Sequence, residues 1–300
     1  MKVVAPGKLL LAGAYAVLDG APALVVAVDR RAIADGDAVA KSPTPEVLAA
    51  VAAAEAPEVD ASALRDGAFK LGLGSSAALL VASLGVVYAR QGRDLRAKDV
   101  RDALFAEARR AHSSVQNGGS GVDIAASVYG GALAYTLASG ELADVRPVAL
   151  PAALVVDVFW CGAPAVTTGM RARVDALRGR DAGVYAARID AIARASRDAI
   201  AAAEADDLPA FVAAEQAGGE ALAALGRDAD SPIIPSALGG LLRLAAEDGA
   251  AFLPSGAGGG DVFVHLGADA ASPRFTAAAT AASMRRVTMK LDSDGVRIAP

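Results

Sequence analysis

Hydrophobic and polar positions form two kinds of pattern along the chain, one typical of strands and one typical of helices. Apolar runs broken by the turn dipeptides Pro6-Gly7, Asp19-Gly20 and Asp35-Gly36 predict strands within residues 1–35. From Ser75 to about Arg90, apolar residues recur with the spacing of one helix face. Similar patterns predict further helices at 45–56, 97–113, 167–179, 182–205, 207–226 and 236–249.

Further strands interrupt these helices without strictly alternating with them. Apolar runs predict strands at 130–138, 152–160, 251–254 and 262–267, and a terminal β-hairpin within 285–300. This mixed order favours an α+β fold over a doubly wound parallel sheet. Near residue 150 a new series of predicted elements begins, with a strand followed by several helices. We therefore expect two domains, at 1–150 and 151–300.

Composition and charge exclude several classes of protein. The net charge of −5 does not suit a nucleic-acid surface, which would need clustered Lys and Arg. The single cysteine, Cys161, cannot form a disulfide within the chain and suits a reducing compartment. No apolar run reaches the length of a membrane span, and the N-terminus does not read as a signal peptide. We therefore expect a cytoplasmic protein, monomeric or homodimeric, with a small-molecule substrate and neither nucleic acid nor membrane as partner.

The turn "GLGSSAA" at 72–78 joins a predicted strand to the helix that starts near Ser75. Glycines let the backbone come close to a ligand, and Ser75 and Ser76 are expected to cap the helix. The first N–H groups of a helix carry partial positive charge, which suits a phosphate chain. No Gly-Lys-Ser/Thr follows, so this is not a Walker A loop. An ordinary strand-to-helix turn with serine caps is the alternative.

Three other segments carry candidate chemistry, each with a structural alternative. In "NGGSGVD" at 117–123, Asp123 is either a carboxylate held among apolar neighbours or the N-cap of a helix that starts at Ile124. The run "SGAGGGD" at 255–261 predicts a very close approach to the backbone, by a phosphate or by another loop. Lys8 is either solvated at a strand start or aimed into a cleft to offset phosphate charge.

Together these segments resemble the three motifs of the GHMP kinase superfamily, across residues 5–261. "PGKLLLAGAYAVLDGAPALVVAVD" looks like the first motif, "GLGSSAA" like the second and "SGAGGGD" like the third. "AHSSVQNGGSGVDIAASVYGGALAY" and "FWCGAPAVTTGM" are most similar to the phosphomevalonate kinases, with the mevalonate kinases next. The chain departs from those patterns at Ala14, where a Glu is common, and at Leu253, where a Lys is common.

The resemblance implies a two-lobed fold, an activity and its cofactors. The N-terminal lobe would be a ribosomal-S5-like ATP-binding lobe and the C-terminal lobe an α/β, ferredoxin-like one, with a cleft between them. The activity would be transfer of the ATP γ-phosphate, with Mg²⁺, to 5-phosphomevalonate to give 5-diphosphomevalonate. Mevalonate or another small alcohol is the alternative acceptor. A non-catalytic ligand sensor of the same fold is an alternative of another class.

The resemblance also implies roles for single residues. Lys8 and Asp123 would form the reacting centre, and Ser76 would be a metal ligand. Glu107 would be a weaker candidate ligand, since a solvated helix charge is the favoured alternative for it. Nucleotide binding would fall to Lys70, Gly72, Leu73, Gly74, Ser75, Ser76, Ala77 and Ala78. The acceptor would be bound by Tyr15, His112, Gln116, Ser120, Gly121, Thr167, Ser255, Gly256, Ala257 and Gly258. Further cations for an anionic acceptor could come from Arg109, Arg110, Arg171 and Arg173, each otherwise a solvent-facing arginine.

Overall fold

The computed structural model describes the chain except for residues 117, 138–142, 163–166 and 300. It divides into two compact units. The N-terminal unit comprises Met1–Leu9, Val25–Pro147 and Met289–Pro300, and the C-terminal unit comprises Leu10–Leu24 and Val148–Thr288. The main boundary falls at 147/148, near the expected position. The units differ from the expected 1–150 and 151–300 because a short early segment and the chain end are exchanged between them.

The N-terminal unit is built on a sheet with the strand order β12-β1-β2-β6-β7, and β3 pairs with β2. Its long strands arise from the apolar runs of the first 40 residues, and positions 3–12 of β1 are buried throughout. A separate short hairpin consists of β4 and β5. The bounds are β1 (Lys2–Ala12), β2 (Pro22–Val39), β3 (Pro57–Asp60), β4 (Arg65–Asp66), β5 (Phe69–Lys70), β6 (Ala132–Leu137), β7 (Ala143–Pro147) and β12 (Arg297–Ile298).

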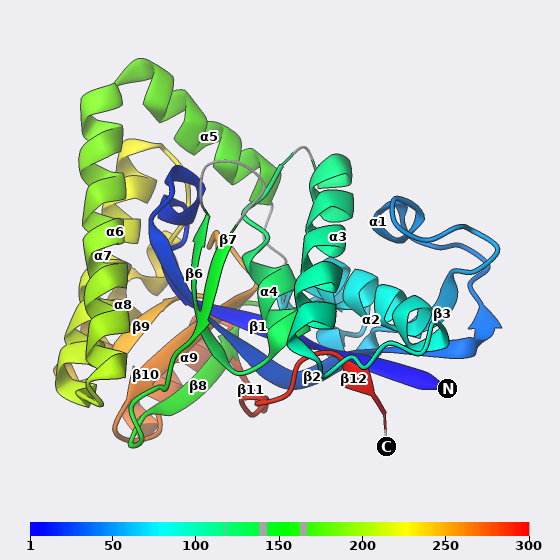
Figure 1. Ribbon diagram of the computed structural model, residues 1–300. Helices are drawn as coiled ribbons and strands as arrows, with labels where there is room; N and C mark the ends of the chain where they lie inside the picture. Colours follow the sequence, from blue (N-terminus) through cyan, green and yellow to red (C-terminus); the bar gives the residue numbers. More distant parts are fainter. Residues whose placement is uncertain (117, 138–142, 163–166, 300) are drawn as a thin grey trace. The chain divides into compact units, whose positions relative to one another are not determined.

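The helices of this unit pack against one another beside the sheet (Figure 1). They are α1 (Pro45–Leu48), α2 (Ser75–Arg90), α3 (Lys98–Gln116) and α4 (Val122–Tyr129), with the 3-10 turn η2 (Ser62–Leu64). The expected helix at 45–56 is only partly formed, because it ends at Leu48 and the chain turns toward β3. Helix α2 has the expected bounds and buries its apolar face around Leu80 and Leu84.

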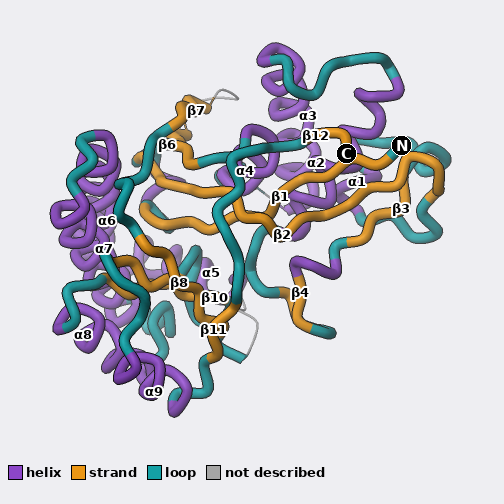
Figure 2. Tube along the Cα trace, turned by 90° about the horizontal axis from the view of Figure 1, so that it is seen from below, coloured by secondary structure: helices purple, strands orange, loops and turns teal. Residues whose placement is uncertain are grey.

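The C-terminal unit has a four-stranded antiparallel sheet with the order β11-β8-β10-β9. Several helices connect β8 to β9 and one connects β10 to β11, which is the ferredoxin-like arrangement. Helices α6 and α7 run side by side in Figures 1 and 2. The bounds are η1 (Ala16–Asp19), β8 (Val155–Trp160), α5 (Thr167–Arg180), α6 (Ala182–Glu204), α7 (Leu208–Asp228), η3 (Ser236–Leu238), α8 (Gly239–Glu247), β9 (Ala251–Pro254), β10 (Val262–Gly267), α9 (Pro273–Ala281) and β11 (Arg285–Val287).

The expected hairpin at the chain end is wrong, because its two strands join different sheets. Strand β11 pairs with β8, whereas β12 pairs with β1. Between them, the Asp292 backbone N–H donates to the Ala27 carbonyl oxygen, and the Asp292 carboxylate is in an ion pair with Arg31 at 2.6 Å. These contacts tie the last residues to the N-terminal unit. Their partners lie more than 250 positions earlier in the chain, so local patterning could not reveal them.

Candidate active site

Lys8 lies on β1 against the backbone of the first glycine-rich turn. Its side chain is 9% exposed, and its Nζ donates a hydrogen bond of 2.9 Å to the Gly72 carbonyl oxygen. Its own backbone N–H donates to the Leu73 carbonyl oxygen at 2.9 Å. A lysine this buried, with its ammonium group bonded to the Gly72 carbonyl oxygen, is not a solvated strand-end charge. Its ammonium group is positioned at the turn.

Gly74 brings this lysine together with Asp123. The glycine is the N-cap of α2 in the left-handed conformation, with φ of 72°. A Cβ added to Gly74 would lie 3.1 Å from Lys8 Cγ and 3.2 Å from Asp123 Cβ. The two side chains therefore meet over the same glycine, although 115 positions separate them in the chain. All three residues belong to the N-terminal unit.

The start of α2 differs from the sequence expectation. Ser75 and Ser76 do not cap the helix, because they occupy its first two positions and Gly74 is the N-cap. Gly74 has no side chain with which to cap the helix, so the first N–H groups of α2 remain suited to an anion. The side chains of Leu73, Ala77 and Ala78 are fully buried, and these residues can offer only backbone groups at the turn.

Asp123 is the second residue of α4, whose N-cap is Gly121 and not Asp123. Its Oδ1 accepts a 3.2 Å hydrogen bond from the Ile124 backbone N–H, and the residue is partly exposed. Tyr135 lies close by and donates its hydroxyl to the Ser120 carbonyl oxygen. Burial raises the pKa of Tyr135 to about 12, with the Asp123 charge adding to the effect and Arg109 opposing it. The aspartate therefore shares its surroundings with a neutral hydroxyl and a cation.

Ser120, Gly121 and Arg109 gather at the same place. A Cβ on Gly121 would lie 3.1 Å from both Cγ and Cδ of Arg109. The Ser120 hydroxyl is 3.4 Å from the Val122 backbone N–H. The structure thus brings the second glycine-rich turn and Arg109 to Asp123. Tyr135 was missed in the sequence, where it is an unremarkable aromatic residue in a strand.

A second group of polar residues adjoins Ser76. The Ser76 hydroxyl lies 3.3 Å from His112 Nε2, and Gln116 Nε2 donates to Glu46 Oε1 at 2.9 Å. Burial acts to raise the pKa of Glu46, but hydrogen bonds from its own backbone N–H and from Gln116, with the nearby His112, hold it below its usual value. The sequence placed His112 and Gln116 on one helix face, as observed. It gave no signal for Glu46, which comes from a short distant helix.

Glu107 is not brought to Ser76. Its carboxylate accepts a 2.7 Å hydrogen bond from the Tyr88 hydroxyl. Ser76 and Tyr88 are twelve positions apart on α2, which corresponds to about 18 Å along the helix. Within the described residues, no group of three or more His, Cys, Asp or Glu side chains is placed to hold a metal ion. The expected Ser76–Glu107 pair of metal ligands is therefore not assembled.

In the C-terminal unit, the third glycine-rich turn is occupied by the protein itself. The Ser255 hydroxyl accepts from the Leu10 backbone N–H at 2.9 Å, and the Tyr15 hydroxyl donates to the Ala257 carbonyl oxygen at 2.7 Å. A Cβ on Gly258 would overlap the Ile233 carbonyl oxygen. Tyr15 is 8% exposed, and burial raises the pKa of its hydroxyl. These groups already have partners within the unit. Gly256, with φ of 119°, belongs to the same turn.

The remaining candidates lie at the surface or outside the described residues. Lys70 is exposed on β5, Arg110 is exposed on α3, and Arg171 and Arg173 are exposed on α5. Arg173 forms an ion pair of 3.5 Å with Asp230. The side chain of Thr167 lies outside the described part of the chain. The structure does not show a contact between any of these residues and the residues around Lys8 and Asp123.

Comparisons with known proteins agree with this geometry. Residues 47–131, which include the first turn and Asp123, match the family described as GHMP kinases N terminal domain. The phosphomevalonate kinase of Streptomyces sp. (strain CL190) is 28% identical over 275 residues, covering 68% of this chain and 72% of that protein. The chain therefore contains a segment similar to the GHMP kinase N-terminal domain, at residues 47–131.

Solved structures extend the likeness of this GHMP kinase fold to nearly the whole chain. A Lin0012 protein from Listeria innocua has a TM-score of 0.81 at 21% identity and covers 100% of this chain and 99% of its own. Streptococcus pneumoniae phosphomevalonate kinase, in complex with phosphomevalonate and AMPPNP, has a TM-score of 0.79 at 19% identity and covers 97% and 99%. Methanococcus jannaschii mevalonate kinase has a TM-score of 0.72 at 15% identity and covers 97% and 98%. In the described part of the chain, no helix is long and apolar enough to cross a membrane.

Proposed function

We propose that this GHMP kinase transfers the γ-phosphoryl group of ATP to the phosphate of 5-phosphomevalonate, which gives 5-diphosphomevalonate and ADP. The observation that carries the proposal is the meeting of Lys8 and Asp123 over Gly74, at a helix start that no side chain caps. The phosphomevalonate kinase relative supports the choice of acceptor. A phosphate oxygen of the acceptor forms the new P–O bond as the bond to the ADP oxygen breaks.

ATP fits the residues around this turn. The first N–H groups of α2 offer hydrogen-bond donors at the positive end of the helix dipole. Gly74 leaves the space that a Cβ would fill between Lys8 and Asp123. Lys8 supplies the positive charge that the transferred group needs, since phosphoryl transfer is catalysed mainly by positioning and by offsetting charge. Its bond to the Gly72 carbonyl oxygen keeps the ammonium group at the turn.

Mg²⁺ fits as an ion held largely by the nucleotide. Magnesium is commonly bound by one or two protein groups together with substrate phosphates and waters. Ser76 can supply one oxygen, and its contact with His112 Nε2 orients the hydroxyl. When bound, the ion would neutralise charge on the phosphates.

The role proposed for Asp123 depends on the acceptor. A phosphate monoester has a second pKa of about 6, so it is already ionised near neutral pH and needs no general base. Asp123 then acts by orienting Lys8, which it meets over Gly74. An alcohol acceptor would instead need a base to take its proton. Arg109, whose side chain lies against Gly121 of the second turn, would help to hold an anionic acceptor.

The reaction uses charged, water-soluble substrates, which fits a cytoplasmic enzyme that acts as a monomer or homodimer. The test is a direct assay of ADP formation with ATP and Mg²⁺, using 5-phosphomevalonate and mevalonate in parallel. ³¹P NMR of the product should show a new diphosphate only with 5-phosphomevalonate. Turnover of mevalonate alone would replace this proposal by a small-alcohol kinase. Ligand binding without turnover of either acceptor would favour the sensor.

A further inference from the structure

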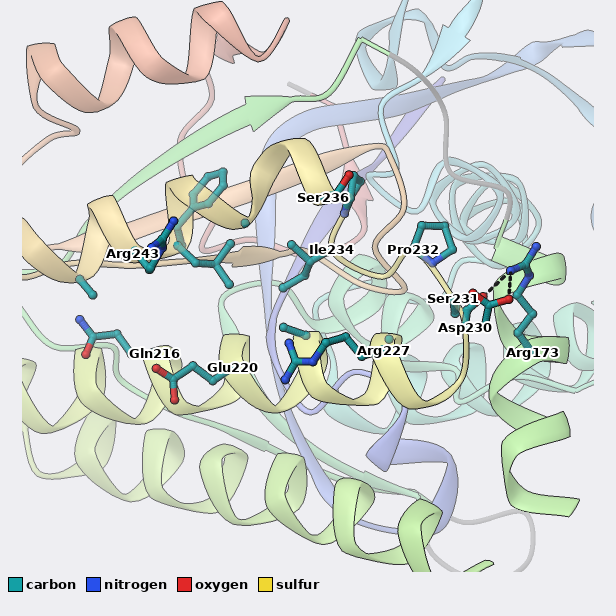
Figure 3. A pocket seen from close by; sticks show the side chains of 17 residues that line it. Arg173, Gln216, Glu220, Arg227, Asp230, Ser231, Pro232, Ile234, Ser236 and Arg243 are labelled. Atoms are coloured by element: carbon teal, nitrogen blue, oxygen red, sulfur yellow. Dashed lines mark hydrogen bonds and ion pairs between the residues drawn. The ribbon is translucent and has the colours of Figure 1, made fainter. Parts of the chain in front are cut away.

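A cavity of about 900 Å³ lies in the C-terminal unit, apart from the residues assigned above to phosphoryl transfer. Figure 3 shows its walls: Gln216, Glu220 and Arg227 project from α7, and Arg243 comes from the facing helix α8. The loop 230–236 closes one end. All of its lining residues belong to one unit, so the cavity depends on no contact outside it.

The charges that line this cavity favour an anion. Arg173 and Asp230 pair with each other at one end, as the dashed lines in Figure 3 show. Arg227 and Arg243 are both exposed, and neither has an ion pair with another described residue. Glu220 is the remaining acid. Two arginines therefore face one carboxylate, and arginine is the side chain best suited to bind phosphate with two parallel hydrogen bonds.

The rest of the lining is apolar, with one buried polar atom unused. Ile234, Leu242 and Phe252 supply the apolar wall. Ser231 also lines the cavity, is 5% exposed, and its hydroxyl has no hydrogen-bond partner among the described residues. Buried polar groups are nearly always hydrogen-bonded, so such a hydroxyl calls for a partner. Concave sites with an apolar lining and a few convergent polar groups are typical of small-molecule binding.

We propose that this cavity binds a small organic phosphate with an apolar body, in a site separate from the ATP and acceptor sites. The phosphate contacts Arg227 and Arg243, and the body lies on the apolar wall. The loop at the end of the cavity also supports the third glycine-rich turn, because Gly259 N–H donates to the Ile233 carbonyl oxygen at 2.9 Å.

The binding test uses 1-naphthyl phosphate, a fluorescent aryl phosphate, with the full chain saturated with Mg²⁺ and AMPPNP so that the nucleotide site is filled. We expect saturable binding that weakens at least tenfold in the double variant Arg227→Gln/Arg243→Gln. Arg197→Gln is the matched control, since Arg197 is exposed on α6 and does not line the cavity. Inorganic phosphate has only the charged group of the probe, and 1-naphthol has only its apolar body. Each should therefore bind more weakly than the intact probe.

A second variant, Ala246→Trp, keeps the charges and fills the cavity from α8. It should abolish binding of the probe. Equal affinity in the wild type and the double variant would overturn the proposal, and so would binding of 1-naphthol as tight as that of the phosphate.

Discussion

The first and third glycine-rich turns have similar sequences but different surroundings. Both contain glycines with positive φ, Gly72 and Gly74 in one, and Gly256, Gly258 and Gly259 in the other. In the third turn, the groups that lie close to the backbone belong to the protein itself. The Ile233 carbonyl oxygen lies against Gly258, and the Tyr15 hydroxyl donates to the Ala257 carbonyl oxygen. In the first, two charged side chains meet at a helix start without a side-chain cap. Glycine content therefore reports that something comes close to the backbone, but not what it is.

Replacing Lys8 should have the largest effect on catalysis. We expect Lys8→Met to lower kcat by a factor of about 100 to 1,000, because charge stabilisation at the reacting group is lost, while affinity for ATP falls little. Lys2→Met is the control, since Lys2 is exposed on the same strand. Steady-state kinetics and nucleotide titration measure both quantities. An unchanged kcat would show that Lys8 has no role in phosphoryl transfer. The first turn would then have only a structural role, like the third.

Alanine at matching glycines separates the two turns by stability and activity. Gly258→Ala should lower the free energy of unfolding by about 3 kcal/mol, since the methyl group overlaps backbone. Gly74→Ala should cost less stability but most of the activity, because its methyl group crowds Lys8 and Asp123.

Gly92→Ala is the control for conformation alone. Gly92 has φ of 75° and no atom within 4 Å of an added Cβ, so we expect a loss of about 1 kcal/mol and full activity. Denaturant unfolding and the ADP assay measure all three variants. Equal losses of activity in Gly74→Ala and Gly92→Ala would mean that the crowding at Gly74 has no role.

Buried Glu215 on α7 makes the stability of the unit that holds the third turn depend on pH. It is 1% exposed, its Oε1 has no hydrogen-bond partner among the described residues, and burial raises its pKa well above the ordinary 4.5. Above pH 4.5 the unfolded state loses this proton while the folded state keeps it. The free energy of unfolding therefore falls as pH rises, by about 1.4 kcal/mol per pH unit until the folded pKa is reached.

Glu215→Met should remove this slope and make the protein more stable near neutral pH. Glu220→Gln, at an exposed position of the same helix, should leave the slope unchanged. Urea unfolding between about pH 5 and 8 measures the difference. A slope that survives in Glu215→Met would show that another group causes it.

The smallest effect is expected at His112, which contacts Ser76 in the first turn. His112→Ala should raise the KM for Mg²⁺–ATP by about tenfold or less, because the loss of one hydrogen bond to the hydroxyl is worth about 1 kcal/mol. His112→Gln, which can still offer a hydrogen-bonding group, should recover part of it. A fall in kcat without a change in this KM would instead place His112 at the acceptor, as the sequence resemblance implied.

Much of the fold followed from local patterns, and the failures have physical causes. Helix α2 was predicted because its apolar stripe and glycine entry are encoded within 20 residues. Helix α9 was missed, although Ser272 caps it and Pro273 is its first residue, a combination that favours a helix start. Strand β12 was misassigned because its pairing with β1 joins opposite ends of the chain.

Within the site, the residue types were predictable but their partners were not. Lys8, Ser76 and Asp123 stood out through their motifs, yet the serines were expected as caps that the structure places inside the helix. Glu46 and Tyr135 carry no local signal, because they reach the site from separate elements. Glu107 was expected as a metal ligand only because the family resemblance implied it. Its contact with Tyr88 places it away from Ser76.

A crystal structure of the chain with Mg²⁺ and AMPPNP tests the central claim most directly. We expect the β- and γ-phosphates against the first N–H groups of α2, with Lys8 Nζ within hydrogen-bond distance of the γ-phosphate and Asp123 beside it. Phosphates bound at the turn 255–261, or a nucleotide that leaves Lys8 on the Gly72 carbonyl oxygen and far from every phosphate, would contradict this account.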